Sequence, residues 1–274
     1  MANKHLQILI AAMNQSDFSL IEKMNIYSDC IMANQTDNAS EGSFDYGPYK
    51  VEIFNSTLVG ISANRNLALS KSTADIVLFA DDDIVYNDGA REGVIEAFEK
   101  MPKADVIVFG CTQTDEYGDS LIDNKHKAGR LSLNGGLKNP SYVIAAKSKS
   151  LRKNKIRFSA MFGAGSSYSF GEDTIFLADC FKKGLKVYTS SFNLGKSTKS
   201  LRWFEGYTDK FFFDKGAIYQ HVFGKFSSLT ILHYSKKYSK VTGIPKKEIK
   251  NYMEHGAKDY RRKQKSNRFQ NDGM

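Results

Sequence analysis

The sequence predicts an α/β protein with a mostly parallel central sheet, helices on both faces of that sheet, and a helical, basic C-terminal region. From residue 5 to about residue 110, short apolar runs alternate with amphipathic segments, the arrangement expected when helices join parallel strands. The composition is that of a globular protein, with 41% hydrophobic residues, 12% aromatic residues and 4 prolines among 274 residues. A chain of this length can bury a sizeable core.

Each element is predicted from its own local pattern. Apolar, β-forming runs predict strands at residues 5–13, 29–34, 49–55, 75–80, 104–110, 142–146 and 185–192. Amphipathic spacing predicts helices at residues 19–27, 61–73, 88–101 and 172–184. Ser62 is expected to cap the second helix, and Gly184 to end the fourth. Polar residues 111–141, rich in Gly and Asn, predict a loop or short hairpins near a site.

The charge divides the chain into a balanced body and a basic end. The net charge is +9, and residues 236–268 hold 12 Lys/Arg against 3 Asp/Glu, which leaves 27 of each sign elsewhere. We therefore expect a domain over residues 1–200 that carries the chemistry. Residues 201–274 are expected to form an aromatic and basic extension that serves an acceptor or a membrane surface. The basic segment also allows nucleic-acid binding, or no partner at all, as a solvated helical appendage.

The cysteines and the apolar runs indicate the cellular compartment of the protein. Cys30, Cys111 and Cys180 are odd in number, far apart and each within an apolar run, a pattern that argues against a disulfide framework or a cysteine zinc site. The apolar run 6–13 is too short to span a membrane and lacks the basic start of a signal peptide. We expect a cytoplasmic protein, which could still contact the inner face of the cell membrane.

An acidic triplet is the strongest chemical signal in the sequence. The apolar run 76–80 stops abruptly at Asp81, Asp82 and Asp83, and ligands of open parallel sheets bind outside the carboxyl ends of the strands. Three adjacent carboxylates repel one another unless a cation offsets them. Mg²⁺ or Mn²⁺, which prefer oxygen ligands and share their coordination with substrate phosphates, are the expected cations. The competing interpretation is a solvated acidic turn.

Two further patterns involve helix starts. Arg65 and Asn66 lie in the first turn of the helix predicted at 61–73, where a guanidinium can contact phosphate or carboxylate. Glu172 and Asp173 open the helix predicted at 172–184, where the free N–H groups stabilise an ionised carboxylate that could act as a general base. Taken singly, these patterns are better explained as a surface arginine and as ordinary first-turn acidic residues.

Taken together, ISANRNLAL, DIVLFADDD and GED before an apolar helix resemble the family 2 glycosyltransferases of the GT-A fold. The resemblance covers roughly residues 5–190. FGAGSSYSFGEDTIFL and RWFEGY resemble a bacterial branch that builds capsular or other surface polysaccharides. The resemblance implies an inverting transfer of a sugar from a nucleotide-diphosphate sugar, with a UDP-sugar favoured, to a hydroxyl of a glycan or lipid-linked acceptor.

The resemblance also assigns roles to single residues. Its metal-binding acidic motif falls on Asp81-Asp82-Asp83, chiefly on Asp83, with Asp81 also a candidate and Mn²⁺ or Mg²⁺ as cofactor. Its general base falls on Asp173, with Glu172 beside it. The residues expected to bind the nucleotide-sugar are Ala11, Ala12, Asn14, Gln35, Arg65, Asp75, Asp81 and Asp82. Trp203, the only tryptophan, is a candidate platform for the acceptor sugar.

One departure from the family concerns the nucleotide, and two other functions compete. The family often has an Asp-rich segment after its second strand, whereas this chain has MANQTDN, so Asn34, Gln35 or Asp37 would have to contact the base. A nucleotidyltransferase could share the sheet and the metal site, but the Gly-rich basic loop usual after its first strand is absent here. A nucleic-acid-binding or anionic-lipid-binding protein would act through the basic segment. The neutral body makes nucleic acid an unexpected partner.

Overall fold

The computed structural model describes residues 4–114, 120–124, 126–198 and 206–271. The chain forms two compact units. The first comprises residues 1–160 and 172–200, and the second comprises residues 161–171 and 201–274. The segment 161–171 therefore packs with the C-terminal residues although it precedes a helix of the first unit.

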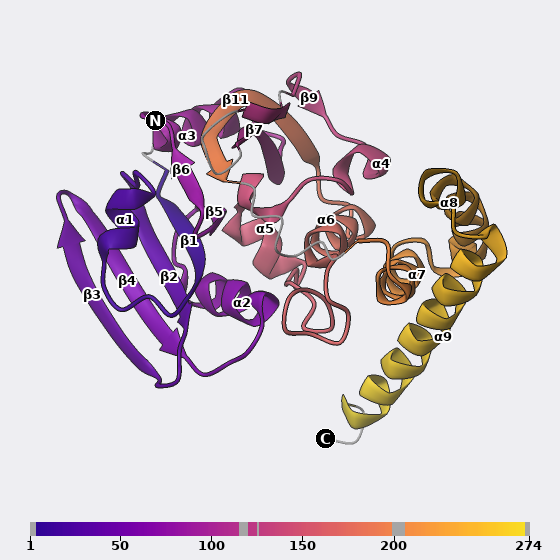
Figure 1. The fold of residues 1–274 in the computed structure, drawn as a ribbon. Helices are drawn as coiled ribbons and strands as arrows, with labels where there is room; N and C mark the ends of the chain where they lie inside the picture. The colour runs from indigo at the N-terminus through magenta and orange to yellow at the C-terminus, as the bar shows by residue number, and fades with distance from the viewer. Residues whose placement is uncertain (1–3, 115–119, 125, 199–205, 272–274) are drawn as a thin grey trace. The chain divides into compact units, whose positions relative to one another are not determined.

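The first unit is built on one sheet that has eleven strands among the described residues (Figure 1). The strands are β1 (Leu6–Met13), β2 (Asp29–Gln35), β3 (Ser40–Tyr46), β4 (Tyr49–Ser56), β5 (Ile76–Asp81), β6 (Ile84–Tyr86), β7 (Val106–Thr114), β8 (Ser120–Asn124), β9 (Gly129–Arg130), β10 (Ile144–Lys147) and β11 (Val187–Thr198). Nine of them follow the order β3-β4-β2-β1-β5-β10-β7-β11-β6, while β8 pairs with β7 and β9 pairs with β11.

Short helices connect these strands. They are α1 (Ser19–Lys23), α2 (Ile61–Lys71), α3 (Ala90–Lys100), α4 (Leu133–Gly136), the 3₁₀ turn η1 (Ser141–Val143), α5 (Ser148–Lys153) and α6 (Glu172–Lys182). Helix α2 packs on β1 and β2, and α3 packs on β11. The predicted α/β class is confirmed, and its strand–helix alternation is the pattern on which the prediction rested.

The sheet is more mixed than the sequence predicts. β4, β2, β1 and β5 are parallel neighbours, as are β7 and β11, but β10 runs antiparallel to both β5 and β7. A parallel neighbour requires a crossover, usually a helix, that returns the chain to the opposite edge. The only α-helix described between β7 and β10 is the four-residue α4. The chain therefore enters β10 from the edge at which β7 ended and runs back.

Two local features differ from the sequence prediction. Strand β3 forms an antiparallel hairpin with β4, closed by Gly47 and Pro48, and Gly47 has a φ of 62°. The sequence SEGSFDY gave no strand signal because β3 is an edge strand with mostly exposed side chains. The expected Ser62 cap is also wrong, since the residue before α2 is Gly60 and makes no side-chain cap.

The core of the first unit consists of the apolar strand residues and the helix faces that cover them. Ile10, Ile31, Phe79 and Val108 are each no more than 1% exposed. Phe79, Phe158 and Phe176 pack as an aromatic cluster, with centroid distances of 4.4–5.3 Å. The three cysteines are free and buried, as expected.

The second unit is helical, consisting of α7 (Asp209–Phe223), the 3₁₀ turn η3 (Gly224–Phe226), α8 (Ser227–Thr242) and α9 (Lys246–Asn271) (Figure 1). Its core is a cluster of Phe212, Tyr219, Ile231, Ile249, Met253 and Ala257. Two glycines let α7 and α9 approach closely, because a Cβ at Gly216 would overlap the carbonyl of Met253 and one at Gly256 would overlap that of Phe213. None of the described helices is long and apolar enough to cross a membrane.

A buried carboxylate holds the segment 161–171 within the second unit. Asp214 on α7 is 0% exposed. Its Oδ2 accepts hydrogen bonds from the Ser169 backbone N–H at 2.8 Å and from the Ser169 hydroxyl at 2.6 Å. Lys210 donates to the same oxygen at 2.6 Å. The buried charge is thus both paired and hydrogen-bonded, as stability requires.

We expect Gly256→Ala to destabilise the second unit, because the added methyl group meets backbone rather than a flexible side chain. Overpacking of this kind costs about 1–3 kcal/mol, and urea unfolding followed by helical circular dichroism measures it. Gly42→Ala is the matched control, since no atom lies within 4 Å of its added Cβ. Equal midpoints for the two variants would contradict the close α7–α9 packing.

Candidate functional site

The carboxyl ends of four parallel strands line up at one edge of the sheet. Ala11 on β1 pairs in register with Ala33 on β2 and with Asp81 on β5, and Asn34 on β2 pairs with Asn55 on β4. The chain adds β2 and β4 on one side of β1 and then crosses through α2 to add β5 on the other side. The strand order therefore reverses between β1 and β5, which is where ligands bind in open α/β sheets.

Asparagine side chains hold the ends of β1, β2 and β4 together. Asn34 is 1% exposed. Its Oδ1 accepts from the Gln15 N–H at 3.0 Å, and its Nδ2 donates to the Gln15 carbonyl and to Asn55 Oδ1, each at 2.8 Å. A pocket of about 170 Å³ lies beside this network, lined by Asn34, Asn55 and residues of the 15–18 loop and of β3. Its amide and hydroxyl groups could hydrogen-bond a planar base.

The remaining residues predicted at the end of β1 lie at the same edge. Ala11 and Ala12 are buried in β1. Asn14 follows with a φ of 54°, a left-handed conformation that turns the chain at the strand end. Gln35 ends β2, and its Oε1 accepts from the Gly60 N–H at 3.0 Å. The structure therefore gathers Ala11, Ala12, Asn14 and Gln35 around the beginning of α2.

The acidic triplet forms the turn between β5 and β6. Asp81 ends β5, and Asp82 and Asp83 occupy the turn with exposed side chains. Partial burial and the neighbouring carboxylates raise the pKa of Asp83 to about 6, although Ser197 on β11 lies 3.4 Å from its Oδ2. The same causes raise the pKa of Asp82. Negative charge is thus crowded at this turn.

Arg65 on α2 lies at the centre of an ion-pair cluster. Its side chain is 2% exposed, and Nη2 lies 2.6 Å from Asp81 Oδ1 while Nη1 lies 3.0 Å from Glu172 Oε1 and 3.2 Å from Asp173 Oδ1. The ring of Phe158 lies 5.3 Å from the guanidinium carbon. Although burial alone would lower it, the three carboxylates raise the pKa of Arg65 further above its ordinary value. Arg65 therefore links the end of β5 to the start of α6.

Within this cluster, the carboxyl group of Asp173 has a raised pKa. One guanidinium faces three carboxylates, so the cluster carries excess negative charge. Burial and the neighbouring Glu172 carboxylate raise the pKa of Asp173 to about 7, and Arg65 opposes that rise. A carboxylate with such a pKa can accept and release a proton near neutral pH. Its side chain remains 24% exposed and can be reached from solvent.

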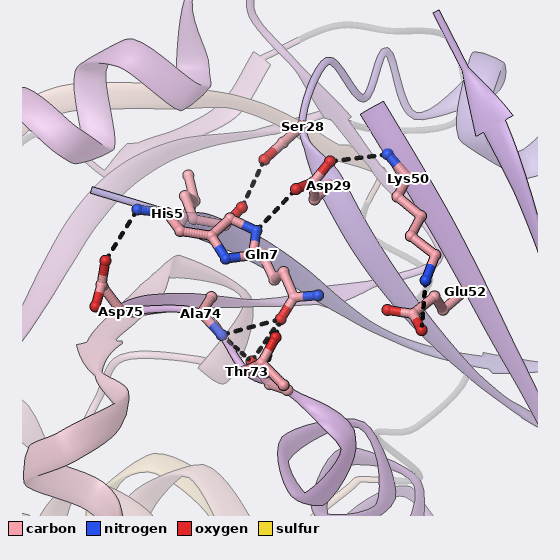
Figure 2. Close-up of polar contacts among 11 residues, drawn as sticks. His5, Gln7, Ser28, Asp29, Lys50, Glu52, Thr73, Ala74 and Asp75 are labelled. Carbon is pink, nitrogen blue, oxygen red and sulfur yellow. Dashed lines mark hydrogen bonds and ion pairs between the residues drawn. The ribbon is translucent and has the colours of Figure 1, made fainter. Parts of the chain in front are cut away.

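Two predicted residues are not placed at this edge. Figure 2 shows Asp75 at the amino end of β5, where Oδ2 accepts from the backbone N–H of His5 at 3.1 Å. The same view shows His5 contacting Asp29 and Gln7 contacting the segment before β5. The structure therefore surrounds Asp75 with contacts that tie strand starts together, at the edge opposite Asp81. Trp203 lies outside the described residues.

Three residues around the site, Phe158, Asn55 and Asn64, were not predicted from the sequence. Phe158 packs under Arg65 from a loop, and Asn66 fixes that loop by donating to the Phe158 carbonyl at 2.8 Å and accepting from its N–H at 2.9 Å. Asn55 completes the asparagine network. Asn64 Nδ2 donates to the Ala12 carbonyl at 3.0 Å, and its buried Oδ1 has no hydrogen-bond partner among the described residues. The sequence signal for Asn64 is the NRN stretch, which places an asparagine on each side of Arg65.

The acidic turn fits a divalent cation that shares its coordination with a substrate. No group of three or more His, Cys, Asp or Glu side chains among the described residues is arranged to hold a metal by itself. Mg²⁺ and similar ions, however, are usually bound through one or two carboxylates, with water and substrate phosphates completing the shell. Asp82 and Asp83 offer exposed oxygens with raised pKa values. Arg65 already pairs with Asp81.

Comparisons with known proteins agree on the kind of fold. Residues 32–163 match the family described as Glycosyl transferase family 2. S. aureus TarS 1–349 has 12% identity and a TM-score of 0.61, over 94% of this chain and 91% of that one. Its UDP complex has 14% identity and a TM-score of 0.58, over 80% and 66% of the two chains. Its UDP-GlcNAc complex has 16% identity and a TM-score of 0.58, over 80% and 67%. No curated protein matches the chain.

At these identities the TarS structures show the fold alone. The matched range 32–163 contains α2 and β5, and hence Arg65 and the acidic turn. Asp173 lies beyond the matched range and is joined to the site by the Arg65 cluster.

Proposed function

We propose that this chain, a family 2 glycosyltransferase with a GT-A-type fold, transfers a sugar from a nucleotide-diphosphate sugar to an acceptor hydroxyl with Asp173 as general base. The observation that carries the proposal is the Arg65 cluster. It joins the acidic turn of β5 to Asp173 through one buried guanidinium. Groups suited to a diphosphate and to an acceptor hydroxyl are thereby fixed relative to each other, as group transfer requires.

The donor is proposed to be a UDP-sugar. The pocket beside Asn34 and Asn55 offers amide groups to a base. The structurally similar TarS has been crystallised with UDP and with UDP-GlcNAc. Asp82 and Asp83 would hold Mn²⁺ or Mg²⁺ at the adjacent turn, with Asp81 kept in place by Arg65. A bound divalent cation would offset the charge of the departing diphosphate.

The proposed chemistry is a single inverting displacement. Asp173, ionised, accepts the proton of the acceptor hydroxyl as the acceptor oxygen bonds to the anomeric carbon. The bond from that carbon to the diphosphate oxygen breaks, and the nucleoside diphosphate leaves with the electron pair. Arg65 does not need to touch the phosphates in this scheme, because it positions Asp173 and Asp81 instead.

The biological setting belongs to the same proposal. We infer a glycan or a lipid-linked molecule as acceptor, and a role in bacterial surface polysaccharide synthesis such as capsule formation. We place the enzyme in the cytoplasm, at the inner face of the cell membrane. The family match favours neither a nucleotidyltransferase nor a nucleic-acid-binding protein.

Donor binding is the first test. We expect isothermal titration to show UDP binding that is stronger with Mn²⁺ than with chelator, because the exposed oxygens of the turn then share the cation with the diphosphate. Asp83→Asn should weaken the Mn²⁺-dependent part about tenfold, because the amide lacks the negative charge and has only one of the two carboxylate oxygens that could bind the cation. Asp88→Asn, in the nearby loop before α3, is the matched control. If neither UDP nor GDP bound under any condition, the proposed donor class would be wrong.

A further inference from the structure

Helix α8 presents an exposed face that the sugar-transfer proposal does not use. The residues exposed on this face or just before it are Lys225, Phe226, Leu229, Leu232, His233, Lys236, Lys237, Lys240 and Val241. Ser227, Ile231 and Ser235 are buried on the opposite side of the helix. With 3.6 residues per turn, Leu229, Lys236 and Lys240 fall on the side of the helix opposite Ile231 and Ser235. The face is therefore a continuous strip along the helix.

The apolar part of this strip is unusually exposed. Phe226 is 57% exposed, Leu229 66% and Leu232 43%, and all three lie within the first half of the strip. Single exposed apolar residues are normal, but three neighbouring ones at helical spacing form a patch that marks an interaction site. Val241, near the other end of α8, is 65% exposed.

The charge of the strip has one sign. Residues 215–247 contain seven lysines and no Asp or Glu. Among the described residues, no ion pair involves Lys236, Lys237 or Lys240. On α9, Lys250 pairs with Glu254 at 2.9 Å and Arg262 pairs with Asp259 at 2.9 Å. Lys236, Lys237 and Lys240 therefore add positive charge without a carboxylate partner to α8, beside the apolar patch.

We propose that the exposed face of α8 docks on an anionic phospholipid bilayer. Phe226, Leu229 and Leu232 would enter the boundary between head groups and acyl chains, while Lys236, Lys237 and Lys240 contact the lipid phosphates. Lysine stems can lie along apolar surface with the ammonium groups in the polar layer, so both residue types fit one interface. A nucleic acid would use the lysines but would leave the three large apolar side chains without a partner.

Vesicle sedimentation of the full chain tests this inference. We expect the protein to sediment with vesicles of phosphatidylcholine and phosphatidylglycerol, and much less with phosphatidylcholine alone. Replacing Lys236, Lys237 and Lys240 together with Ala should lower the partition coefficient on the order of a hundredfold, from the contribution of each lysine near an anionic surface. Lys103, Lys149 and Lys153, exposed lysines of the first unit, replaced by Ala give a control with the same change of charge.

A second variant separates lipid insertion from simple charge attraction. Leu229→Ser with Leu232→Ser leaves the charge unchanged, and we expect it to lower binding to the same anionic vesicles at least tenfold, since the buried apolar groups of both leucines are lost. Unchanged circular dichroism shows that these variants are folded. The inference is overturned if the serine variant binds as tightly as the parent. It is also overturned if the α8 and control lysine variants lose binding equally, or if the chain prefers an oligonucleotide to the vesicles.

This inference rests on residues of the second unit alone. Titration with UDP reports on the first unit, so failure of vesicle binding would leave the proposed transfer chemistry standing, and failure of UDP binding would leave the membrane contact standing.

Discussion

Asp173→Asn is expected to lower the rate of sugar transfer strongly while leaving UDP-sugar binding intact. The amide is close in shape to the carboxylate but cannot accept the proton of the acceptor hydroxyl. Loss of a general base typically costs about 10²–10⁴-fold in rate. The measurement is kcat with a fixed acceptor, alongside isothermal titration with the donor. Asp179→Asn is the matched control, because it makes the same change on the same helix, about two turns further along.

The pH dependence of the parent enzyme provides a second measurement on Asp173. The pKa of this carboxyl is raised to about 7 by burial and by Glu172, and only the ionised form can act as a base. The transfer rate should therefore rise with pH through about 7 and level off above it. The rise should be missing from the residual activity of Asp173→Asn. A rate that stays flat over about three pH units, from roughly pH 5 to pH 8, would assign the proton transfer to another group.

Arg65→Ala is expected to be the most destabilising single substitution at the site. It removes the cation shared by Asp81, Glu172 and Asp173 and leaves partly buried carboxylates unpaired. Breaking a buried ion pair in this way costs about 3–5 kcal/mol. Urea unfolding at neutral pH measures the loss. The deficit should shrink in acid, because the carboxylates can then take up protons and no longer need a cation.

Two further variants make this prediction decisive. Arg65→Lys keeps one positive charge but lacks the planar fork that reaches three carboxylates, so we expect an intermediate stability and a lower kcat with unchanged donor affinity. Arg157→Ala removes an exposed arginine of the same unit and should change stability by less than about 0.5 kcal/mol. If Arg65→Ala were as stable as Arg157→Ala, the buried cluster would not exist as described.

Position along the chain and local pattern were enough to predict several parts of the site. The apolar run 76–80 had to be a buried strand, so Asp81 had to lie at its carboxyl end, and the structure places it there. The acidic pair before an apolar helical pattern had to open a helix, and α6 begins at Glu172. These predictions succeed because strand and helix periodicity are local properties of the chain.

Other features required pairing between distant segments. Nothing in YVIAA specifies that β10 runs antiparallel between β5 and β7, because direction depends on where the preceding loop leaves the chain. Phe158 and Arg65 are brought together only by the Asn66 clamp on the loop backbone. The polar segment β3 forms a strand because its backbone pairs antiparallel with β4.

The sequence by itself thus determined the α/β class, the acidic strand end and the basic composition of the C-terminal region. Each of these follows from the local pattern of apolar and polar residues or from the number of charged residues. The tertiary structure alone decided that Arg65 faces three carboxylates rather than solvent. It also decided the partner of Asp75, whose Oδ2 accepts from the backbone N–H of His5 just before β1. The physical reason is that a side chain's partners depend on which strands and helices pack together, and that packing is set by burial summed over the whole chain.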